Sequence, residues 1–277
     1  MKFGMKLFGA LLMAVLLLTS FRAEAALGAD WNSHMITVTG SGVPPAGIRG
    51  GQARILARRA AVADAYRQLA EIVEGVQVDA ETTVEMAMLK SDSVRLSVSA
   101  VIRGAQIVDE NITRDGVYEV TVQLPMFGAT NSLASAVFER PEYVEPFPQP
   151  EPIPVRPSSP SVSIDITVRG GYTGVVIDCR GFHVQPVMSP VIKNSHGTKI
   201  YGHKNIDPDY VIEYGMADYA DSMNQASRAG SNPLVIRAER MDDFDSTPII
   251  SVADANKILS ENELSGFLEK TAVVFLY

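Results

Sequence analysis

Apolar side chains recur at spacings of three, four and seven residues between Gly51 and Glu74. This spacing places them on one face of an α-helix, with arginine and glutamine side chains on much of the remaining surface. The predicted apolar face comprises Ile55, Leu56, Val62, Ala63, Tyr66, Leu69, Ala70 and Val73. We expect Gly75 to end this helix in the left-handed conformation that glycine adopts without steric cost.

Alternation of apolar and polar residues after this helix predicts half-buried strands over residues 94–100 and 118–124. The dipeptide Asp115-Gly116 lies between residues 107–112 and 117–124 and is typical of a tight β-hairpin turn, which adds a strand over 107–112. A helix that covers one face of an antiparallel sheet predicts a compact α+β domain, which we expect over residues 33–138.

Strand-like and helix-like segments also follow one another in the C-terminal part of the chain. Residues 164–168 and 175–177 flank Arg169-Gly170-Gly171, which predicts a hairpin. Further strands are expected at 234–238, 248–250 and 273–277, and helices at 214–228, 253–259 and 261–268. Gly230 is expected to end the first helix, and Ser251 and Ser260 to cap the other two. These elements predict a second, mixed α/β domain over residues 162–277.

A proline-rich segment separates the two predicted domains. Half of the 16 prolines lie between Pro141 and Pro160, and proline there prevents a continuous helix or central strand. We therefore expect residues 139–161 to form an extended polyproline spacer that holds the domains up to roughly 60 Å apart. The alternatives are a spacer that packs on a neighbouring domain and a docking site for a proline-reading module.

The first 25 residues have the pattern of a secretory signal peptide. Lys2 and Lys6 precede an apolar run from Leu7 to Leu18, and the small residues of Ala23-Glu24-Ala25 follow. Cleavage is expected after Ala25, and the mature protein is expected in the periplasm. No cysteine follows the apolar run to carry a lipid, and a single cysteine, Cys179, excludes an intramolecular disulfide.

The net charge of the whole chain is −8. Loss of residues 1–25 removes three cationic side chains and one anionic side chain, which leaves −10. This balance argues against nucleic-acid binding and against electrostatic docking on anionic lipid. No later segment is long and apolar enough to predict a transmembrane span.

Catalytic motifs are missing from the sequence, which contains neither a nucleophile elbow nor a phosphate-binding loop. Cys179 lies in a strand-like apolar run and is interpreted as a buried hydrophobic residue. His183, His196 and His203 are close in sequence but lack the spacing of a compact metal site. We predict that the protein is not an enzyme and has no cofactor or metal. A metal-dependent hydrolase that uses these three histidines is a less favoured alternative.

Cationic and aromatic side chains mix in the segment Thr198–Lys204 of this acidic protein. Lys199, Tyr201, His203 and Lys204 are therefore the candidate binding residues, which would recognise a glycan or an acidic partner by hydrogen bonds and stacking. A plain hairpin with exposed lysines is the alternative interpretation.

Three runs of the first domain carry a resemblance to a known family. The alanine-rich run Ala57–Ala70 and the later runs Val101–Val108 and Gly116–Val122 occur in the order found in the twenty-kilodalton envelope lipoprotein (LPP-twenty) family. The same region is similar to the N-terminal domain of the flagellar assembly protein FlgT. The resemblance implies a non-catalytic envelope protein with surface, adhesion or flagellar-assembly roles. The chain departs from the lipoprotein pattern because it lacks the lipid-bearing cysteine.

The signal peptide, the resemblance and the missing catalytic motifs together predict an exported interaction or assembly component. It would act in the periplasm or at the outer membrane, reach a membrane through a partner, and be flagellum-associated. The expected partners are an envelope protein complex or a cell-wall polymer. The main alternative is a periplasmic module that binds a glycan or another ligand.

Overall fold

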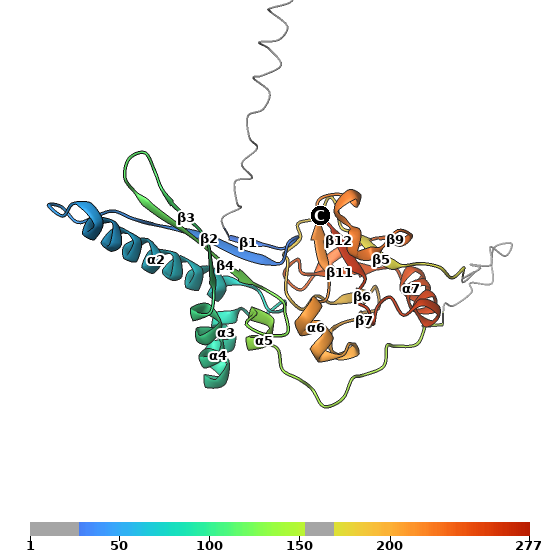
Figure 1. The fold of residues 1–277 in the computed structure, drawn as a ribbon. Coiled ribbons are helices and arrows are strands. Elements are labelled where there is room, and N and C mark those ends of the chain that lie inside the picture. The colour runs from blue at the N-terminus through green and yellow to red at the C-terminus, as the bar shows by residue number, and fades with distance from the viewer. Residues whose placement is uncertain (1–27, 153–168) are drawn as a thin grey trace, which may run out of the picture.

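The computed structural model describes residues 28–152 and 169–277, so the predicted signal peptide, its cleavage site at Ala25 and most of the spacer lie outside the described residues. Residues 28–138 form an N-terminal half, residues 139–152 form a strap, and residues 169–277 form a C-terminal half (Figure 1). The N-terminal half contains β1 (Gly28–Asp30), β2 (Met35–Gly42), α2 (Gly50–Gly75), α3 (Val84–Lys90), α4 (Asp92–Arg103), β3 (Gln106–Ile112), β4 (Tyr118–Pro125) and α5 (Leu133–Val137).

The N-terminal half is a helix on an antiparallel sheet, as the sequence predicts. The strand order is β1-β2-β4-β3, with antiparallel pairing throughout. The long helix α2 covers one face of this sheet (Figure 1). Alternate residues of β4, namely Val120, Val122 and Leu124, are fully buried, because they point toward the core that α2 closes.

The face of α2 that meets the sheet consists mainly of alanine. The buried residues are Ala53, Ala57, Ala61, Ala65, Leu69 and Val73. Gly40 and Gly42 in β2 face this helix, and a methyl group on either glycine would overlap with the α2 backbone. Because the backbones approach so closely, small residues are needed at the start of the helix, and Ile55 is exposed instead of buried. Gly75 is the last helical residue and does not adopt the predicted left-handed conformation.

The predicted strand over residues 94–100 is wrong, because this segment lies in helix α4. Ser91 caps the helix by accepting a hydrogen bond from the backbone of Val94. Val98 and Val101 are buried in α4, a spacing of three that fits a helical face as well as the apparent alternation fits a strand. The helix packs near α3, a helix that is not among the predicted elements.

The hairpin of β3 and β4 is confirmed, with the two strands antiparallel across the turn at Asp115-Gly116. Arg58 of α2 pairs with Glu110 of β3, and the Tyr118 hydroxyl donates to the same carboxylate at 2.7 Å. The Arg58 guanidinium and the Tyr118 hydroxyl lower the pKa of the Glu110 carboxyl to about 2. This cluster fixes the outer strand of the sheet to the helix.

The C-terminal half contains two further sheets, in agreement with the predicted mixed α/β class. Its elements are β5 (Gly174–Asp178), β6 (Ile192–Asn194), β7 (Lys199–Tyr201), η1 (His203–Asn205), α6 (Pro208–Tyr214), β8 (Asp218–Ala220), η2 (Met223–Gln225), η3 (Ser227–Ala229), β9 (Pro233–Arg237), β10 (Arg240–Asp242), β11 (Thr247–Ile250), α7 (Val252–Ser265) and β12 (Val273–Leu276). One sheet has the order β8-β12-β5-β9, with parallel pairing throughout, and the other has the order β10-β11-β6-β7.

Strands β9, β11 and β12 confirm three predicted strands, whereas other predictions for this half are wrong. Strand β5 confirms the predicted strand at 175–177 and pairs in parallel with β12 and β9, whereas the predicted hairpin partner at residues 164–168 lies outside the described residues. The predicted helix 214–228 is instead the end of α6, strand β8 and two short 3₁₀ turns, η2 and η3. Ser251 caps α7 as predicted. Ser260 lies inside α7, which is one helix and not two.

The described part of the proline-rich segment does not hold the two halves apart. Residues 139–152 run as an extended strap along the C-terminal half (Figure 1). The backbone N–H of Glu145 donates to the carbonyl of Lys204 at 2.7 Å, and Phe147 packs against the C-terminal core. Proline prevents regular structure in the strap but leaves its side chains and carbonyls available for these contacts, so packing on a neighbour prevails over the predicted free spacer.

Candidate functional site

The two halves share a packed interface that joins their cores. Met188 and Ile212 of the C-terminal half belong to the buried cluster of the N-terminal half. Backbone N–H groups of Met188 and Ser189 donate to the carbonyls of Gln77 and Val78 at 3.0 and 2.8 Å. These hydrogen bonds join the backbones of the two halves at adjacent residues, so they fix the position of one half against the other.

A half-buried cluster of titratable and charged side chains lies in this interface. The Nε2 atom of His34 in the N-terminal half is 3.3 Å from Oδ1 of Asp218 in the C-terminal half. The same oxygen forms an ion pair with Nε of Arg228 at 2.7 Å. The His34 ring contacts the edge of Phe127, with ring centroids 4.9 Å apart. Nε2 has no aligned hydrogen-bond partner among the described residues. Burial is the main cause that lowers the pKa of His34, against the opposing effect of Asp218.

The lowered pKa of His34 predicts that the interface weakens in mild acid. The unfolded chain binds a proton near pH 6.5 more readily than the folded protein does, so the His34 contribution is complete above that pH. It declines as the pH falls through 6.5 toward the lower pKa of the folded state. We expect the free energy of unfolding to drop between pH 7.5 and 5.5 by on the order of 1 kcal/mol more in the parent protein than in His34→Gln. Urea denaturation at both pH values measures this difference, and equal pH dependence in the two proteins would contradict it.

The strap is fixed near its end by one carboxylate. Glu151 accepts hydrogen bonds from Thr198 at 2.5 Å, from Asn194 at 2.6 Å and from His196 at 2.8 Å. These donors lower the pKa of the Glu151 carboxyl to about 2. Its main chain also exchanges two hydrogen bonds of 2.7 Å with the amide of Asn256 in α7. Glu151 therefore connects the strap to the turn after β6 and to α7.

Glu151→Gln is expected to loosen the strap, because the amide replaces a charged acceptor that has three donors. Amide hydrogen exchange at Glu145 and residue 151 is expected to become several-fold faster in the variant. The same loosening is expected in the parent protein as the pH falls below about 4.5 toward 2, where the carboxyl takes up a proton. Glu142→Gln is the matched control, since Glu142 is exposed and makes no side-chain hydrogen bond or ion pair among the described residues. Unchanged exchange in Glu151→Gln would show that the main-chain contacts alone hold the strap.

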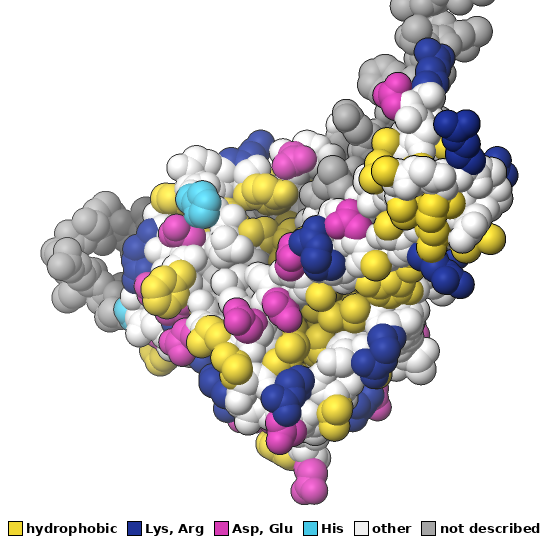
Figure 2. Space-filling model, turned by 90° about the vertical axis from the view of Figure 1, so that its left-hand side faces the viewer, with side chains coloured by type: hydrophobic (Ala, Val, Ile, Leu, Met, Phe, Trp, Pro, Cys, Tyr) yellow, Lys and Arg dark blue, Asp and Glu magenta, His cyan; other side chains and the backbone are white. Residues whose placement is uncertain are grey.

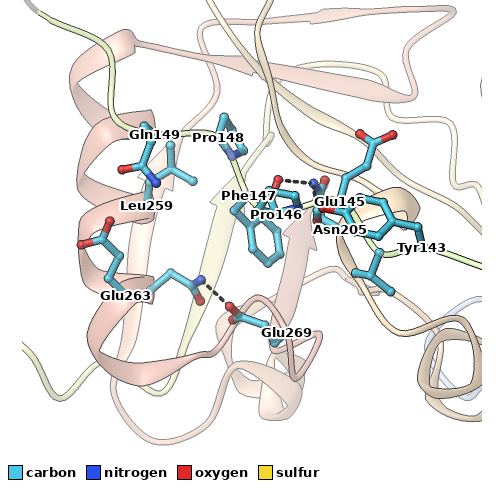
Figure 3. A pocket seen from close by; sticks show the side chains of 12 residues that line it. Tyr143, Glu145, Pro146, Phe147, Pro148, Gln149, Asn205, Leu259, Glu263 and Glu269 are labelled. Atoms are coloured by element: carbon cyan, nitrogen blue, oxygen red, sulfur yellow. Dashed lines mark hydrogen bonds between the residues drawn. The ribbon is translucent and has the colours of Figure 1, made fainter.

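Two cavities lie beside the strap. The first, of about 450 Å³, is between residues 143–149 and helix α7. Figure 3 shows the strap crossing this space, with the ring of Phe147 pointing into it and Leu259 and Glu263 on the helix side. Asn205 holds the strap on the other side by donating to the carbonyls of Glu145 and Pro146 at 3.2 and 3.1 Å.

The second cavity, of about 500 Å³, lies where the strap, the N-terminal half and the C-terminal half meet, and is called here the interdomain cavity. Its volume suits a small ligand or a short polymer segment. Apolar, acidic and cationic side chains are all present in its wall. The lining residues are Val78, Asp79, Thr82, Ala87, Val137, Phe138, Glu139, Pro141, Tyr143, Glu145, Ser189, His203, Lys204, Pro208 and Val211.

Of the four predicted binding residues, His203 and Lys204 line the interdomain cavity, and Lys199 and Tyr201 do not. Lys199 is exposed on β7, outside the cavity wall. Tyr201 is fully buried, and its hydroxyl donates to the carbonyl of Met216 at 2.6 Å, so its ring is not available to stack on a ligand. Strands β6 and β7 form the plain hairpin that was the alternative interpretation.

His203 and Ser189 form the nearest approach to a catalytic pair in the cavity wall. The hydroxyl of Ser189 is 3.4 Å from Nδ1 of His203, and Ser189 itself is buried. Burial and the neighbouring Lys204 lower the pKa of His203, whereas Asp79 opposes this shift. Within the described residues no carboxylate is hydrogen-bonded to the imidazole, so the pair lacks the orienting group of a serine hydrolase.

The three histidines of the hydrolase alternative have separate partners. His183 lies 3.2 Å from Asp245, His196 pairs with Glu151, and His203 faces Ser189. Among residues 28–152 and 169–277, no three His, Cys, Asp or Glu side chains are placed to share a metal ion. Cys179 is buried as predicted, and burial raises the pKa of its thiol to about 12, which keeps it protonated and unreactive.

His34, Asp218, Arg228, Phe147 and Glu151, which join the two halves and the strap, are not among the residues predicted from the sequence. These residues come from both halves and from the strap, and none belongs to a recognisable motif. The only local signal is that Glu151 and Phe147 interrupt a run of prolines. Their roles depend on tertiary contacts between segments that are far apart in the chain.

Family comparisons match each half separately. Residues 46–125 match the model described as LPP20 lipoprotein, which confirms this part of the resemblance read from the sequence. Residues 174–277 match the model described as Treponema pallidum Tp0624, second domain. A search of curated proteins finds no match.

The first match covers α2, α3, α4 and the β3–β4 hairpin. It supports an exported, envelope-associated protein. In the part of the chain that the structure describes, no helix has both the length and the apolar character needed to cross a membrane.

Proposed function

We propose that this protein is a non-catalytic component of the periplasm or outer membrane that acts by binding other envelope components. The observation that carries the proposal is the match of residues 46–125 to the LPP20 lipoprotein family. The two halves share a buried cluster, and Glu151 fixes the strap to the C-terminal half. These contacts favour a protein that binds partners through a rigid surface over an enzyme that must open and close.

The outer strand β3 supports a role in protein assembly. All seven of its residues are exposed, and β3 lies at the edge of the sheet with only β4 as a neighbour. The free edge offers unpaired backbone donors and acceptors to an extended segment of a partner. A flagellum-associated assembly is one envelope complex in which such a component would act.

Gradient fractionation of cells after mild crosslinking tests the assembly role. We expect the protein to shift into outer-membrane or basal-body fractions only after crosslinking, and mass spectrometry of the adduct then identifies the partner. A protein that remains a free monomer in the soluble periplasm under the same conditions would contradict the proposal.

A ligand-binding module is the second candidate function, favoured by the interdomain cavity. The cavity wall contains Lys204 and His203 together with acidic and aromatic side chains, which suits a polymer that carries both polar and apolar groups, such as cell-wall glycan. We expect retention on purified peptidoglycan to fall in Lys204→Gln. Lys199→Gln is the matched control, because it removes the same charge outside the cavity. No retention of the parent protein would exclude this candidate.

A further inference from the structure

The start of α2 and the turn between β3 and β4 form a basic and apolar end of the molecule. This basic tip is defined here as residues 43–59 and 112–118. In Figure 1 it lies at the far end from the C-terminal half. Figure 2 faces this end and shows hydrophobic side chains beside Lys and Arg side chains.

Apolar side chains project from the tip into solvent. Val43 is 65 % exposed, Ile55 is 56 % exposed and Ile112 is 45 % exposed. A hollow of about 210 Å³ beside Ile112, lined in part by Pro44 and Tyr118, is too small to hold a macromolecule. The tip therefore presents exposed apolar side chains and not a groove.

Positive charge gathers at the same place. Residues 43–59 contain four arginines, Arg49, Arg54, Arg58 and Arg59, and no acidic residue, while residues 112–118 add Arg114 and one carboxylate, Asp115. Arg58 pairs with Glu110, whereas Arg49, Arg54 and Arg59 have no carboxylate within 4.0 Å among the described residues. A helix start favours negative charge, so these arginines do not serve the stability of α2.

We propose that the basic tip binds the surface of an anionic phospholipid bilayer. This inference rests on the envelope location in the proposed function. Guanidinium groups pair with lipid phosphates while Val43, Ile55 and Ile112 enter the boundary between headgroups and acyl chains. A protruding tip suits a fluid bilayer, because lipids can surround the tip on all sides. A folded protein partner would contact the tip over only a small area, which gives little binding energy.

The acidic character of the whole chain does not oppose this contact. Electrostatic interactions fall off over about 8 Å at physiological ionic strength. Helix α2, with its 26 residues, is roughly 39 Å long, so its start is several screening lengths from its end. The net charge of the chain disfavours contact with anionic lipid as a whole, whereas the local charge decides contact at the tip.

Vesicle flotation of the mature protein tests the proposal. We expect binding to vesicles of three parts phosphatidylcholine and one part phosphatidylglycerol, weak binding to pure phosphatidylcholine, and release by added salt. Arg54→Gln combined with Arg59→Gln should weaken binding roughly thirtyfold, at about 1 kcal/mol for each charge. Ile55→Ser combined with Ile112→Thr should weaken it on the order of tenfold.

Lys90→Gln combined with Arg103→Gln is the matched control, because it removes the same charge from exposed positions on α3 and α4. Circular dichroism checks that all variants fold. Lack of vesicle binding by the parent protein, equal binding to neutral vesicles, or an equal loss in the control pair would overturn the proposal. If the protein enters crosslinked envelope complexes but does not bind vesicles, the lipid inference fails while the proposed function stands. If it binds vesicles but never enters such complexes, the assembly role fails instead.

Discussion

Gly40→Ala is expected to destabilise the N-terminal half by about 3 kcal/mol or more. Gly40 lies in β2, opposite Val120 of β4, and faces the α2 backbone at Ala61 and Ala65. A methyl group at this position would overlap with main-chain atoms of the helix. Main chain cannot move aside as the end of a flexible side chain can, so helix and sheet must separate and lose burial along the shared core.

Urea unfolding of the mature protein, followed by circular dichroism, measures the effect of this substitution. Gly51→Ala is the matched control, because a methyl group at Gly51 would meet no atom within 4 Å. Alanine has the higher helix propensity, so we expect the control to be unchanged or stabilised by up to about 1 kcal/mol. If Gly40→Ala unfolds at the same urea concentration as the parent, the close approach of β2 to α2 is not required for folding.

Phe275→Ala is expected to destabilise the C-terminal half by about 3 to 5 kcal/mol. Phe275 is 1 % exposed and lies in β12, between β8 and β5. Its ring centroid is 5.3 Å from that of Tyr219, whose hydroxyl donates to the carbonyl of Val187 at 3.1 Å. Truncation leaves a cavity next to this tyrosine, and neighbouring strands hold the surrounding backbone in place.

Guanidinium unfolding, monitored by tyrosine fluorescence and circular dichroism, measures the Phe275 effect. Val235→Ala in the edge strand β9 is the control, since Val235 is half exposed and should cost less than about 1 kcal/mol. Similar losses in the two variants would indicate that the centre of this sheet is no better packed than its edge.

Local patterns predict those elements whose signals lie within a few residues. The β3–β4 hairpin follows from alternation and Asp115-Gly116, and the start of α7 follows from the serine at its cap. The period of α2 follows from its apolar spacing, but the buried face does not. That face depends on Gly40 and Gly42 in another strand, which the helix sequence alone does not contain.

Errors in prediction occur where two local patterns fit the same residues. Residues 94–100 alternate like a strand, but Val98 and Val101 lie on a helical face once Ser91 caps the helix. The segment 214–228 contains strong helix formers, yet Asp218 pairs with Arg228 and β8 joins β12 in the parallel sheet. Contacts between distant segments outweigh intrinsic helix propensities, which differ by less than about 1 kcal/mol for each residue.

The sequence by itself determines the fold class, the export signal as a prediction, and the resemblance of residues 46–125 to an envelope lipoprotein family. These features depend on composition, on the spacing of apolar residues and on the order of short segments, all of which can be read along the chain. The tertiary structure alone decides that the strap lies on the C-terminal half, that His34 meets Asp218 across the interface, and that Tyr201 is buried while His203 lines a cavity. Each of these depends on contacts between distant segments, whose energies are set by packing and burial and not by neighbouring residues.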